Sequence, residues 1–142
     1  MAEPYVFRGN SHRDHAALKQ WIMRTRKEQA LEPDLPIVDP HHHLWDDGRG
    51  LYLLEDILAD IGGGHNVRAT VFIECRTMYR PGPEAQRPLG EVEFVNGISA
   101  MSASGGHGPV RVAAAIVGHA DLRLGEKVQD VRETQLALTG GR

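Results

Sequence analysis

Three short apolar segments, each followed by an amphipathic stretch of helical length, constrain the fold of this 142-residue chain most strongly. The apolar segments cover about residues 35–39, 67–75 and 110–117. The amphipathic stretches cover about residues 53–61, 89–103 and 124–138, with apolar side chains at helical spacing. Strands that alternate with helices in this way pair in parallel through right-handed crossovers. The sequence therefore predicts an α/β fold.

A further amphipathic segment precedes the first strand. Apolar side chains recur at helical spacing from about residue 12 to residue 31. Pro33 and Pro36 end this helix, because proline does not continue a helix and disfavours helical geometry in the residue before it. We therefore expect an N-terminal arm and helix over residues 1–34, followed by an α/β part over residues 35–142.

The three strand–helix units fit two architectures. One is a small open sheet, and the other is the first part of a (β/α)8 barrel, which typically needs about 250 residues. The segment 110–117 is almost wholly apolar after Arg111, which predicts a strand that is buried on both faces.

The composition narrows the class of protein. Hydrophobic residues make up 41% of the chain, charged residues 25%, and the formal net charge is -3. This balance is typical of a soluble globular protein, and without a dense basic stripe it favours neither nucleic acid nor an anionic membrane as partner. No apolar run approaches the roughly 18 residues that a membrane-spanning helix needs.

The N-terminus and the cysteine content bear on the compartment. The first residues lack the basic and apolar regions of a signal peptide. The single cysteine, Cys75, excludes an internal disulfide and fits a reducing environment. We therefore expect a cytoplasmic protein.

The segment Asp39-Pro-His41-His42-His43 directly follows the first strand and carries metal-binding side chains. Successive strand residues point to opposite faces, so Asp39, His41 and His43 are expected on one face and His42 on the other. Two imidazoles on one face are able to converge on one divalent ion at about 2.0–2.1 Å. Asp39 is expected to support them by accepting the ring N–H of a neighbouring histidine. The alternative is a histidine-rich turn that caps the strand.

Two further polar residues follow the second and third strands. Glu74 lies at the end of the second strand and His119 just after the third. Barrel enzymes build their sites at the carboxyl ends of the strands, so both are candidates for contact with a substrate. The alternatives are an ion pair between Glu74 and Arg76 or Arg80, and a hydrogen-bonded capping role for His119.

The loop after the second strand adds Arg76, Tyr79 and Arg80 as candidate substrate-binding residues. Arginine binds carboxylates through two parallel hydrogen bonds, which suits an acidic small molecule. The alternative is that these are solvent-facing loop residues. Cys75 is expected to be a buried structural cysteine, because the charge of Glu74 raises the pKa of a neighbouring thiol.

These residues together resemble the amidohydrolase-related metal-dependent hydrolases, in the branch of the sugar-lactone and pyrone-dicarboxylate lactonases. The resemblance rests on Ile37-Val-Asp-Pro-His-His-His-Leu-Trp-Asp46, which is similar to the first barrel strand of that family with its Asp-x-His-x-His signature. Four supporting segments are Val71-Phe-Ile-Glu-Cys-Arg76, Met78-Tyr-Arg80, Gly90-Glu-Val-Glu-Phe94 and Val117-Gly-His-Ala-Asp-Leu122. The resemblance runs from about residue 35 to the C-terminus. It implies a partial (β/α)8 TIM-type barrel of roughly three βα units, preceded by an N-terminal helix.

The resemblance also implies a chemistry. His41 and His43 are expected to bind a catalytic divalent ion, commonly zinc, which polarises a carbonyl and lowers the pKa of bound water. Some members of this branch work without metal and use the same histidines to hold the substrate, so both possibilities stay open. The general base of the family is an aspartate at the eighth strand, and no acidic residue follows Glu133 here. We therefore expect the base beyond Arg142, and a chain that is truncated or requires another chain.

Two functions follow as hypotheses. The first is an amidohydrolase-type hydrolase that acts on a lactone, ester or amide of a small carboxylated compound. The second is a non-catalytic partial barrel that associates with itself or with a complementary chain.

Overall fold

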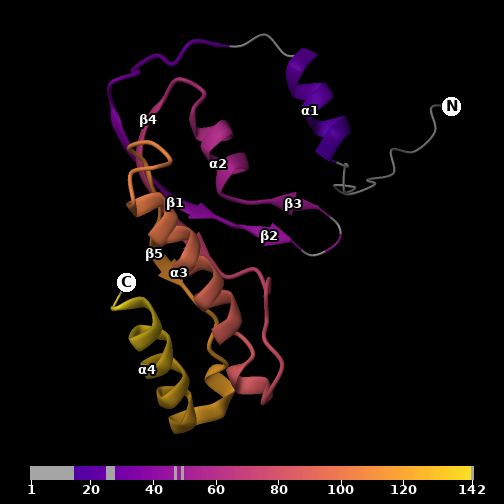
Figure 1. Cartoon of the computed structure of the whole chain (residues 1–142), viewed down its shortest axis with the longest axis vertical. Helices are drawn as coiled ribbons and strands as arrows, with labels where there is room; N and C mark the ends of the chain where they lie inside the picture. The colour runs from indigo at the N-terminus through magenta and orange to yellow at the C-terminus, as the bar shows by residue number, and fades with distance from the viewer. Residues whose placement is uncertain (1–14, 25–27, 47, 49, 142) are drawn as a thin grey trace, which may run out of the picture.

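The computed structural model describes residues 15–24, 28–46, 48 and 50–141 (Figure 1). The helices are α1 (His15–Arg24), α2 (Leu54–Ile61), α3 (Leu89–Ala103) and α4 (Val128–Thr139). The strands are β1 (Pro36–His42), β2 (Trp45–Asp46), β3 (Leu51–Tyr52), β4 (Asn66–Ile73) and β5 (Arg111–Val117). Two 3-10 segments cover Glu84–Gln86 and Leu122–Lys127. The chain is thus a mixed α/β protein, as the alternating pattern predicts.

A three-stranded parallel sheet organises the fold. Its order is β1-β4-β5, so strands that follow one another in the helix–strand alternation are neighbours in the sheet. Both pairings are parallel, and each contains a register shift. Among the described residues the sheet stays open and forms no closed barrel.

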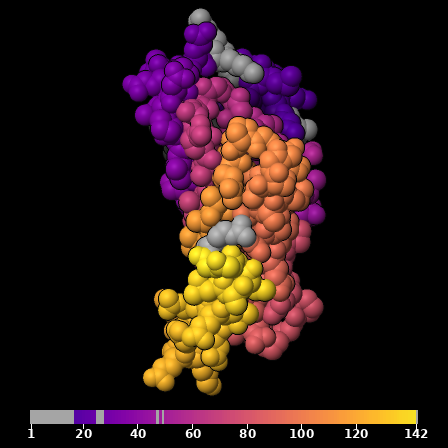
Figure 2. Space-filling view, turned by 60° about the vertical axis from the view of Figure 1, so that its left-hand side comes forward, coloured from indigo at the N-terminus to yellow at the C-terminus, as the bar shows by residue number. Residues whose placement is uncertain are grey.

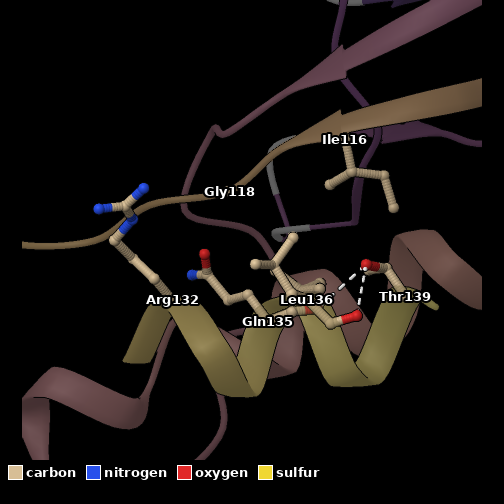
Figure 3. A pocket seen from close by; sticks show the side chains of 7 residues that line it. Ile116, Gly118, Arg132, Gln135, Leu136 and Thr139 are labelled. Atoms are coloured by element: carbon tan, nitrogen blue, oxygen red, sulfur yellow. Dashed lines mark hydrogen bonds between the residues drawn. The ribbon is translucent and has the colours of Figure 1, made fainter. Parts of the chain in front are cut away.

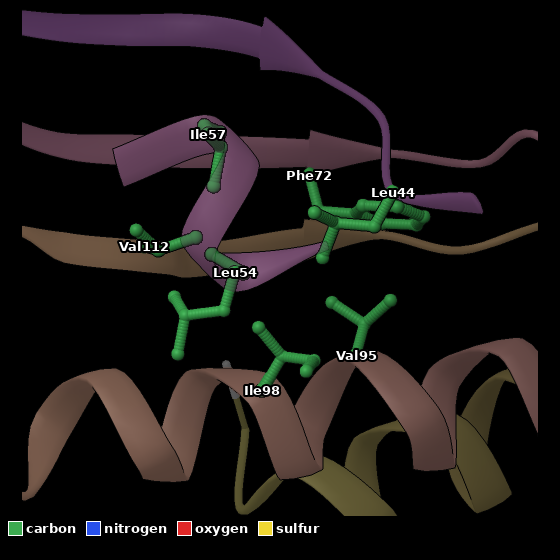
Figure 4. Packing of buried hydrophobic residues seen from close by; sticks show 8 residues of the cluster. Leu44, Leu54, Ile57, Phe72, Val95, Ile98 and Val112 are labelled. Atoms are coloured by element: carbon green, nitrogen blue, oxygen red, sulfur yellow. The ribbon is translucent and has the colours of Figure 1, made fainter. Parts of the chain in front are cut away.

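Helices α2 and α3 cover one face of this sheet. Phe72 of β4 and Val112 of β5 are almost fully buried there, and they share one cluster with Leu54 of α2 and Val95 of α3 (Figure 4). Helix α3 presents its buried side chains at helical spacing, as expected for residues 89–103. In helix α2, the Asp56 carboxylate accepts a hydrogen bond from the Leu53 N–H and so stabilises the first turn.

The opposite face of the sheet is open. Val38 is 61% exposed and Val117 is 48% exposed, and the strand register puts both on the face away from Phe72. The prediction that residues 110–117 are buried on both faces is therefore wrong. An apolar strand is buried on both faces only when other elements cover both faces. Here β5 is an edge strand, and helices cover only one of its faces.

The N-terminal helix is shorter than the sequence pattern predicts. Helix α1 ends at Arg24, and residues 28–30 are not helical. The expected start at residue 12 and the stretch 25–27 lie outside the described residues. Trp21 and Ile22 of the apolar stripe of α1 are 53% and 50% exposed, so the stripe gains little of the tertiary packing that stabilises a short helix.

A short hairpin follows β1. Strands β2 and β3 pair antiparallel, with Trp45 opposite Tyr52. Their rings lie 5.8 Å apart between centroids with planes 37° apart. Cross-strand aromatic pairs of this kind stabilise a hairpin that is too short for a periodic sequence signal.

The last helix starts later than expected. The 3-10 segment Leu122–Lys127 precedes α4, because Gly125 has φ 58 and ψ -133 and interrupts helical geometry there. Asp121 caps this segment by accepting the N–H of Arg123, and the Arg123 guanidinium holds the pKa of the Asp121 carboxyl at about 2. Gly140 ends α4 in the left-handed conformation, as its position after the helix predicts.

The body is elongated. In the space-filling view, the N-terminal segments lie at one end and α4 with its preceding 3-10 segment lies at the other (Figure 2). Within the described residues, no helix has both the length and the apolar character that crossing a bilayer requires.

Gly90 is the tightest point of α3. A Cβ atom there would collide with the Met78 carbonyl oxygen and lie 2.7 Å from the Arg80 main-chain nitrogen. We expect Gly90→Ala to lower the free energy of unfolding by about 1–3 kcal/mol, because the main chain of the loop has to move. Chemical denaturation measures the change.

Gly97 provides the matched control on the same helix. A Cβ atom at Gly97 has nothing within 4 Å, so Gly97→Ala is expected to raise the free energy of unfolding by up to about 1 kcal/mol. Equal effects of the two substitutions would contradict the packing of α3 against the loop.

Candidate functional site

The side chains of His41 and His43 converge at the carboxyl end of β1. Their Nε2 atoms lie 3.2 Å apart, and the rings are almost perpendicular with centroids 4.9 Å apart. The Nδ1 atom of His43 lies 2.8 Å from the carbonyl oxygen of Ile73 at the end of β4. A carbonyl oxygen only accepts hydrogen bonds, so Nδ1 of His43 carries a proton. In the neutral ring, Nε2 of His43 then offers a lone pair towards His41.

This geometry fits two arrangements, a hydrogen bond between the two rings and a metal ion bound by both. An N–H on Nε2 of His41 is able to donate to the lone pair of His43 across 3.2 Å. Two nitrogens bound to one tetrahedral zinc at about 2.0–2.1 Å lie about 3.3 Å apart, which is close to the same separation. The rings are therefore already spaced as two ligands of one ion. A hydrogen bond from the other ring nitrogen to a carbonyl is also the usual arrangement that orients a metal-binding histidine.

His42 points to the other side of the strand, as alternation along a strand predicts. It is buried, and its Nε2 atom lies 3.0 Å from the hydroxyl oxygen of Thr70. The same hydroxyl accepts the N–H of Ala113, so two hydrogen bonds at the Thr70 hydroxyl link all three strands. Burial lowers the pKa of His42 to about 4, which keeps the ring neutral near neutral pH. His42 is thus part of the core beneath the site.

Asp39 supports the site through the main chain. Its Oδ1 atom accepts the backbone N–H of His41 at 3.0 Å, whereas a contact with a histidine ring was expected from the sequence. Asp and Asn side chains often bond the backbone two residues further on, and this local turn competes with any longer-range contact. Asp39 therefore fixes the course of the chain just before the two rings.

A cleft of about 1000 Å³ opens beside the histidines. The hairpin contributes Trp45 and Tyr52 to its wall, and the loop after β4 contributes Arg76. The rings of His43 and Trp45 lie 5.8 Å apart between centroids, so the aromatic surface is continuous from the histidine pair to Tyr52. A cleft with aromatic walls and a few polar groups suits a small organic molecule.

Glu74 and His119 are in hydrogen-bond contact at the ends of β4 and β5. The distance from Glu74 Oε2 to His119 Nδ1 is 2.7 Å, and both side chains are about one-third exposed. The alternative expected from the sequence was an ion pair of Glu74 with Arg76 or Arg80. Arg80 is bound by Glu93 at 2.7 Å.

The other two loop candidates do not line the cleft. Arg80 points to Glu93 on α3, and the hydroxyl of Tyr79 is buried without a hydrogen-bond partner among the described residues. Burial raises the pKa of Tyr79 to about 12. Of the three residues expected to hold an acidic substrate, Arg76 alone reaches the cleft.

Glu91 was not among the site residues expected from the sequence, and it is fully buried in α3. Its Oε1 atom accepts the backbone N–H groups of Cys75 at 3.0 Å and Thr77 at 2.9 Å. Arg76, between the two donors, has φ 66, and Met78, after them, has φ 50. These positive φ angles curve the loop so that its N–H groups surround the carboxylate, as in an anion-binding nest. Glu91 thus sets the conformation that places Arg76. Its position four residues before Val95, on the buried stripe of the helix, was the available signal.

Cys75 is half-buried, and its Sγ atom lies 3.4 Å from the carbonyl oxygen of Leu44. Burial and then the charge of Glu91 raise the pKa of the thiol to about 11. The predicted direction of this shift is confirmed, although the charge responsible is Glu91 rather than Glu74. A raised pKa favours the protonated thiol at neutral pH, which agrees with the structural role expected for Cys75.

The potential metal ligands are few. Among the residues that the structure describes, no three His, Cys, Asp or Glu side chains converge as a ligand set. His41 and His43 fit two positions of such a set.

A second, smaller cavity of about 140 Å³ lies between the end of β5 and α4 (Figure 3). Ile116, Gly118, Gln135 and Thr139 line it. Its size is below that of ordinary ligand pockets, so it marks loose packing next to His119.

Comparisons with models of protein families, with curated proteins and with solved structures found no match to this chain.

The buried carboxylate of Glu91 gives a testable consequence. We expect Glu91→Ala to lower the free energy of unfolding by about 2–4 kcal/mol, because it leaves two backbone N–H groups without their acceptor. Glu93→Ala on the same helix removes only an exposed ion pair and is expected to cost less than about 1 kcal/mol. Urea denaturation compares the two variants, and equal losses would show that Glu91 does not hold the loop.

Proposed function

We propose that this protein is a hydrolase of the amidohydrolase type that acts on a lactone, ester or amide of a small carboxylated compound. The observation that carries the proposal is the convergence of His41 and His43, with Nε2 atoms 3.2 Å apart, beside a cleft of about 1000 Å³. Within this proposal the two histidines hold either a divalent ion such as zinc or, without metal, the substrate itself.

The sheet supports a barrel ancestry for the chain. Its strands are neighbours in sequence order, and both crossover helices, α2 and α3, pack on the same face. A (β/α)8 barrel is built in this way, whereas a doubly wound sheet places helices on both faces. The histidine pair lies at the carboxyl end of β1, where barrel enzymes build their sites.

Each residue has a role in the proposed reaction. Ile73 orients His43 by accepting its Nδ1–H, so that Nε2 is free to bind. The aromatic wall of Trp45 and Tyr52 excludes water from one side of the substrate, and Arg76 attracts its carboxylate. His41 and His43 would hold a divalent ion, which when bound would supply Lewis-acid polarisation of the carbonyl and lower the pKa of a bound water.

Zinc binding tests the proposal. We expect the wild-type protein to bind zinc stoichiometrically, as measured by isothermal titration calorimetry and elemental analysis. Loss of a residue that hydrogen-bonds a metal ligand typically weakens metal binding about 10–100-fold. His41→Gln and His43→Gln should each weaken zinc binding by more than this, because each removes a ligand itself. The exposed His65→Gln is the matched control and should bind as the wild type does.

The same variants then enter an assay with a panel of small lactones and carboxylated esters. Hydrolysis that depends on both His41 and His43 supports the proposal with or without metal. A wild-type protein that neither binds zinc nor hydrolyses any member of the panel would contradict it.

The open face of the sheet favours a second candidate function. Val38 and Val117 expose apolar surface on that face, and β1 and β5 are both edge strands. Exposed edges and apolar patches promote association. As the alternative, we propose a non-catalytic module that completes its sheet against a second copy or a complementary chain.

Light scattering coupled to size-exclusion chromatography tests the alternative. We expect concentration-dependent dimers that Val117→Lys converts to monomers, because a charge on the open face opposes its burial. Leu122→Lys, at a residue that is 76% exposed outside the sheet, is the matched control and should leave the dimer intact. A monomer at every concentration would exclude self-association.

A further inference from the structure

The aromatic wall of the cleft ends at a carboxylate. The wall runs from His43 through Trp45 to Tyr52, and the ring centroids are 5.8 Å apart in each step. The Tyr52 hydroxyl donates a hydrogen bond to Oδ2 of Asp60 at 2.7 Å, which joins the β2–β3 hairpin to α2 (Figure 1). The wall therefore connects the histidine pair to a negative charge.

Carboxylates outnumber lysine and arginine side chains around the cleft. The lining carboxylates are Asp39, Asp56 and Asp60, and the lining cations are Lys19 and Arg76. Burial raises the pKa of the Tyr52 hydroxyl above its usual range, and the hydrogen bond and charge of Asp60 add to this shift. The charges of Asp56 and Asp39 raise the same pKa further. All three carboxylates therefore act on the Tyr52 end of the wall.

Aromatic faces next to a carboxylate form a recognition surface for a cation. Tryptophan and tyrosine rings attract a positive charge that lies within about 6 Å of the ring centroid. Trp45 and Tyr52 are half-buried and both line the cleft. An ionised carboxylate has about four acceptor sites, so Asp60 still accepts hydrogen bonds after it has bound the Tyr52 hydroxyl. An ammonium group only donates, and it fits this surface.

The loop after β4 offers the opposite chemistry. Arg76 and the following Thr77 both line the cleft. Thr77 is 3% exposed, and its Oγ1 atom is buried without a hydrogen-bond partner among the described residues. Buried polar groups are nearly always hydrogen-bonded, so an unpaired hydroxyl in the wall of a cleft points to a ligand as its partner. The guanidinium and the hydroxyl are both donors, which suits a carboxylate.

We propose that the substrate carries an ammonium group, held by Asp60 beside the rings of Trp45 and Tyr52. Its reacting carbonyl lies at the histidine pair, and its carboxylate lies at Arg76 and Thr77. The substrate is thus an ester, lactone or amide derived from an amino acid, with an apolar chain along the aromatic wall between the carbonyl and the ammonium group. This inference rests on the proposed hydrolase function and names the class of compound that the cleft selects.

Two p-nitrophenyl esters of matched length test the ammonium site. p-Nitrophenyl 6-aminohexanoate ends in an ammonium group where p-nitrophenyl heptanoate ends in a methyl group. We expect the full chain to hydrolyse the amino ester with a kcat/KM about 3–30-fold higher, after correction for the uncatalysed rates. A partly exposed ion pair and a cation–π contact together give a preference of this size.

Substitution of Asp60 tests which residue gives the preference. Asp60→Asn removes the charge but keeps an acceptor for the Tyr52 hydroxyl, so the contact between the hairpin and α2 is preserved. We expect this variant to lose the preference for the amino ester. Asp130→Asn, at an exposed position of α4, is the matched control and should keep it. Circular dichroism verifies the fold of both variants, and a folded Asp60→Asn that keeps the preference overturns the proposal.

Binding without turnover separates this inference from the hydrolase function. A nitrogen-15 NMR titration of the full chain with 6-aminohexanamide and with heptanamide measures the two affinities. We expect the amino compound to bind more tightly, with resonance shifts at Tyr52 and Asp60 that Asp60→Asn abolishes.

The combined outcomes decide between the two proposals. A protein that prefers 6-aminohexanamide but hydrolyses neither ester supports the ammonium site and contradicts the hydrolase function. A protein that hydrolyses both esters without preference overturns the ammonium site and leaves the hydrolase function standing. A protein that binds neither amide and hydrolyses neither ester overturns both.

Discussion

The hydrogen bond from His43 Nδ1 to the Ile73 carbonyl is the contact on which the site depends. It joins the segment after β1 to the end of β4 at 2.8 Å. Because β1 and β4 pair in parallel, this hydrogen bond fixes the orientation of the His43 ring. It also determines which nitrogen of His43 carries the proton, and so leaves Nε2 facing His41. The continuous aromatic wall to Trp45 and Tyr52 follows from the same ring position.

Buried polar groups hold the strand ends in place around this contact. His42 and Thr70 connect the three strands through hydrogen bonds in the core. Glu91 accepts backbone N–H groups of the loop that carries Arg76. Each is a buried group with a specific partner, and such groups are costly to leave unpaired. Specific polar contacts therefore hold the carboxyl ends of the strands where the candidate side chains project, although the opposite face of the sheet is open.

Much of this fold was predictable from local patterns. The helices over 53–61 and 89–103, the parallel strands and the opposite orientation of His42 all follow from side-chain periodicity. The hairpin β2–β3 was not predictable in the same way, because two-residue strands carry no period. The burial of β5 was overestimated, because the composition of a strand gives its apolar character but not which elements cover its two faces. The length of α1 was overestimated for the same reason.

The candidate site was predictable in part. The pairing of His41 with His43 is a consequence of alternation, whereas the main-chain role of Asp39 and the nest around Glu91 depend on turns with left-handed residues that periodicity does not encode. The central claim is that the two histidines form one preorganised binding pair. Nitrogen-15 NMR of their side chains during a zinc titration tests it most directly. The account predicts the Nδ1–H tautomer of His43 and a joint shift of both Nε2 resonances as zinc binds, whereas an Nε2–H tautomer of His43 with no response to zinc or to a bound lactone would contradict it.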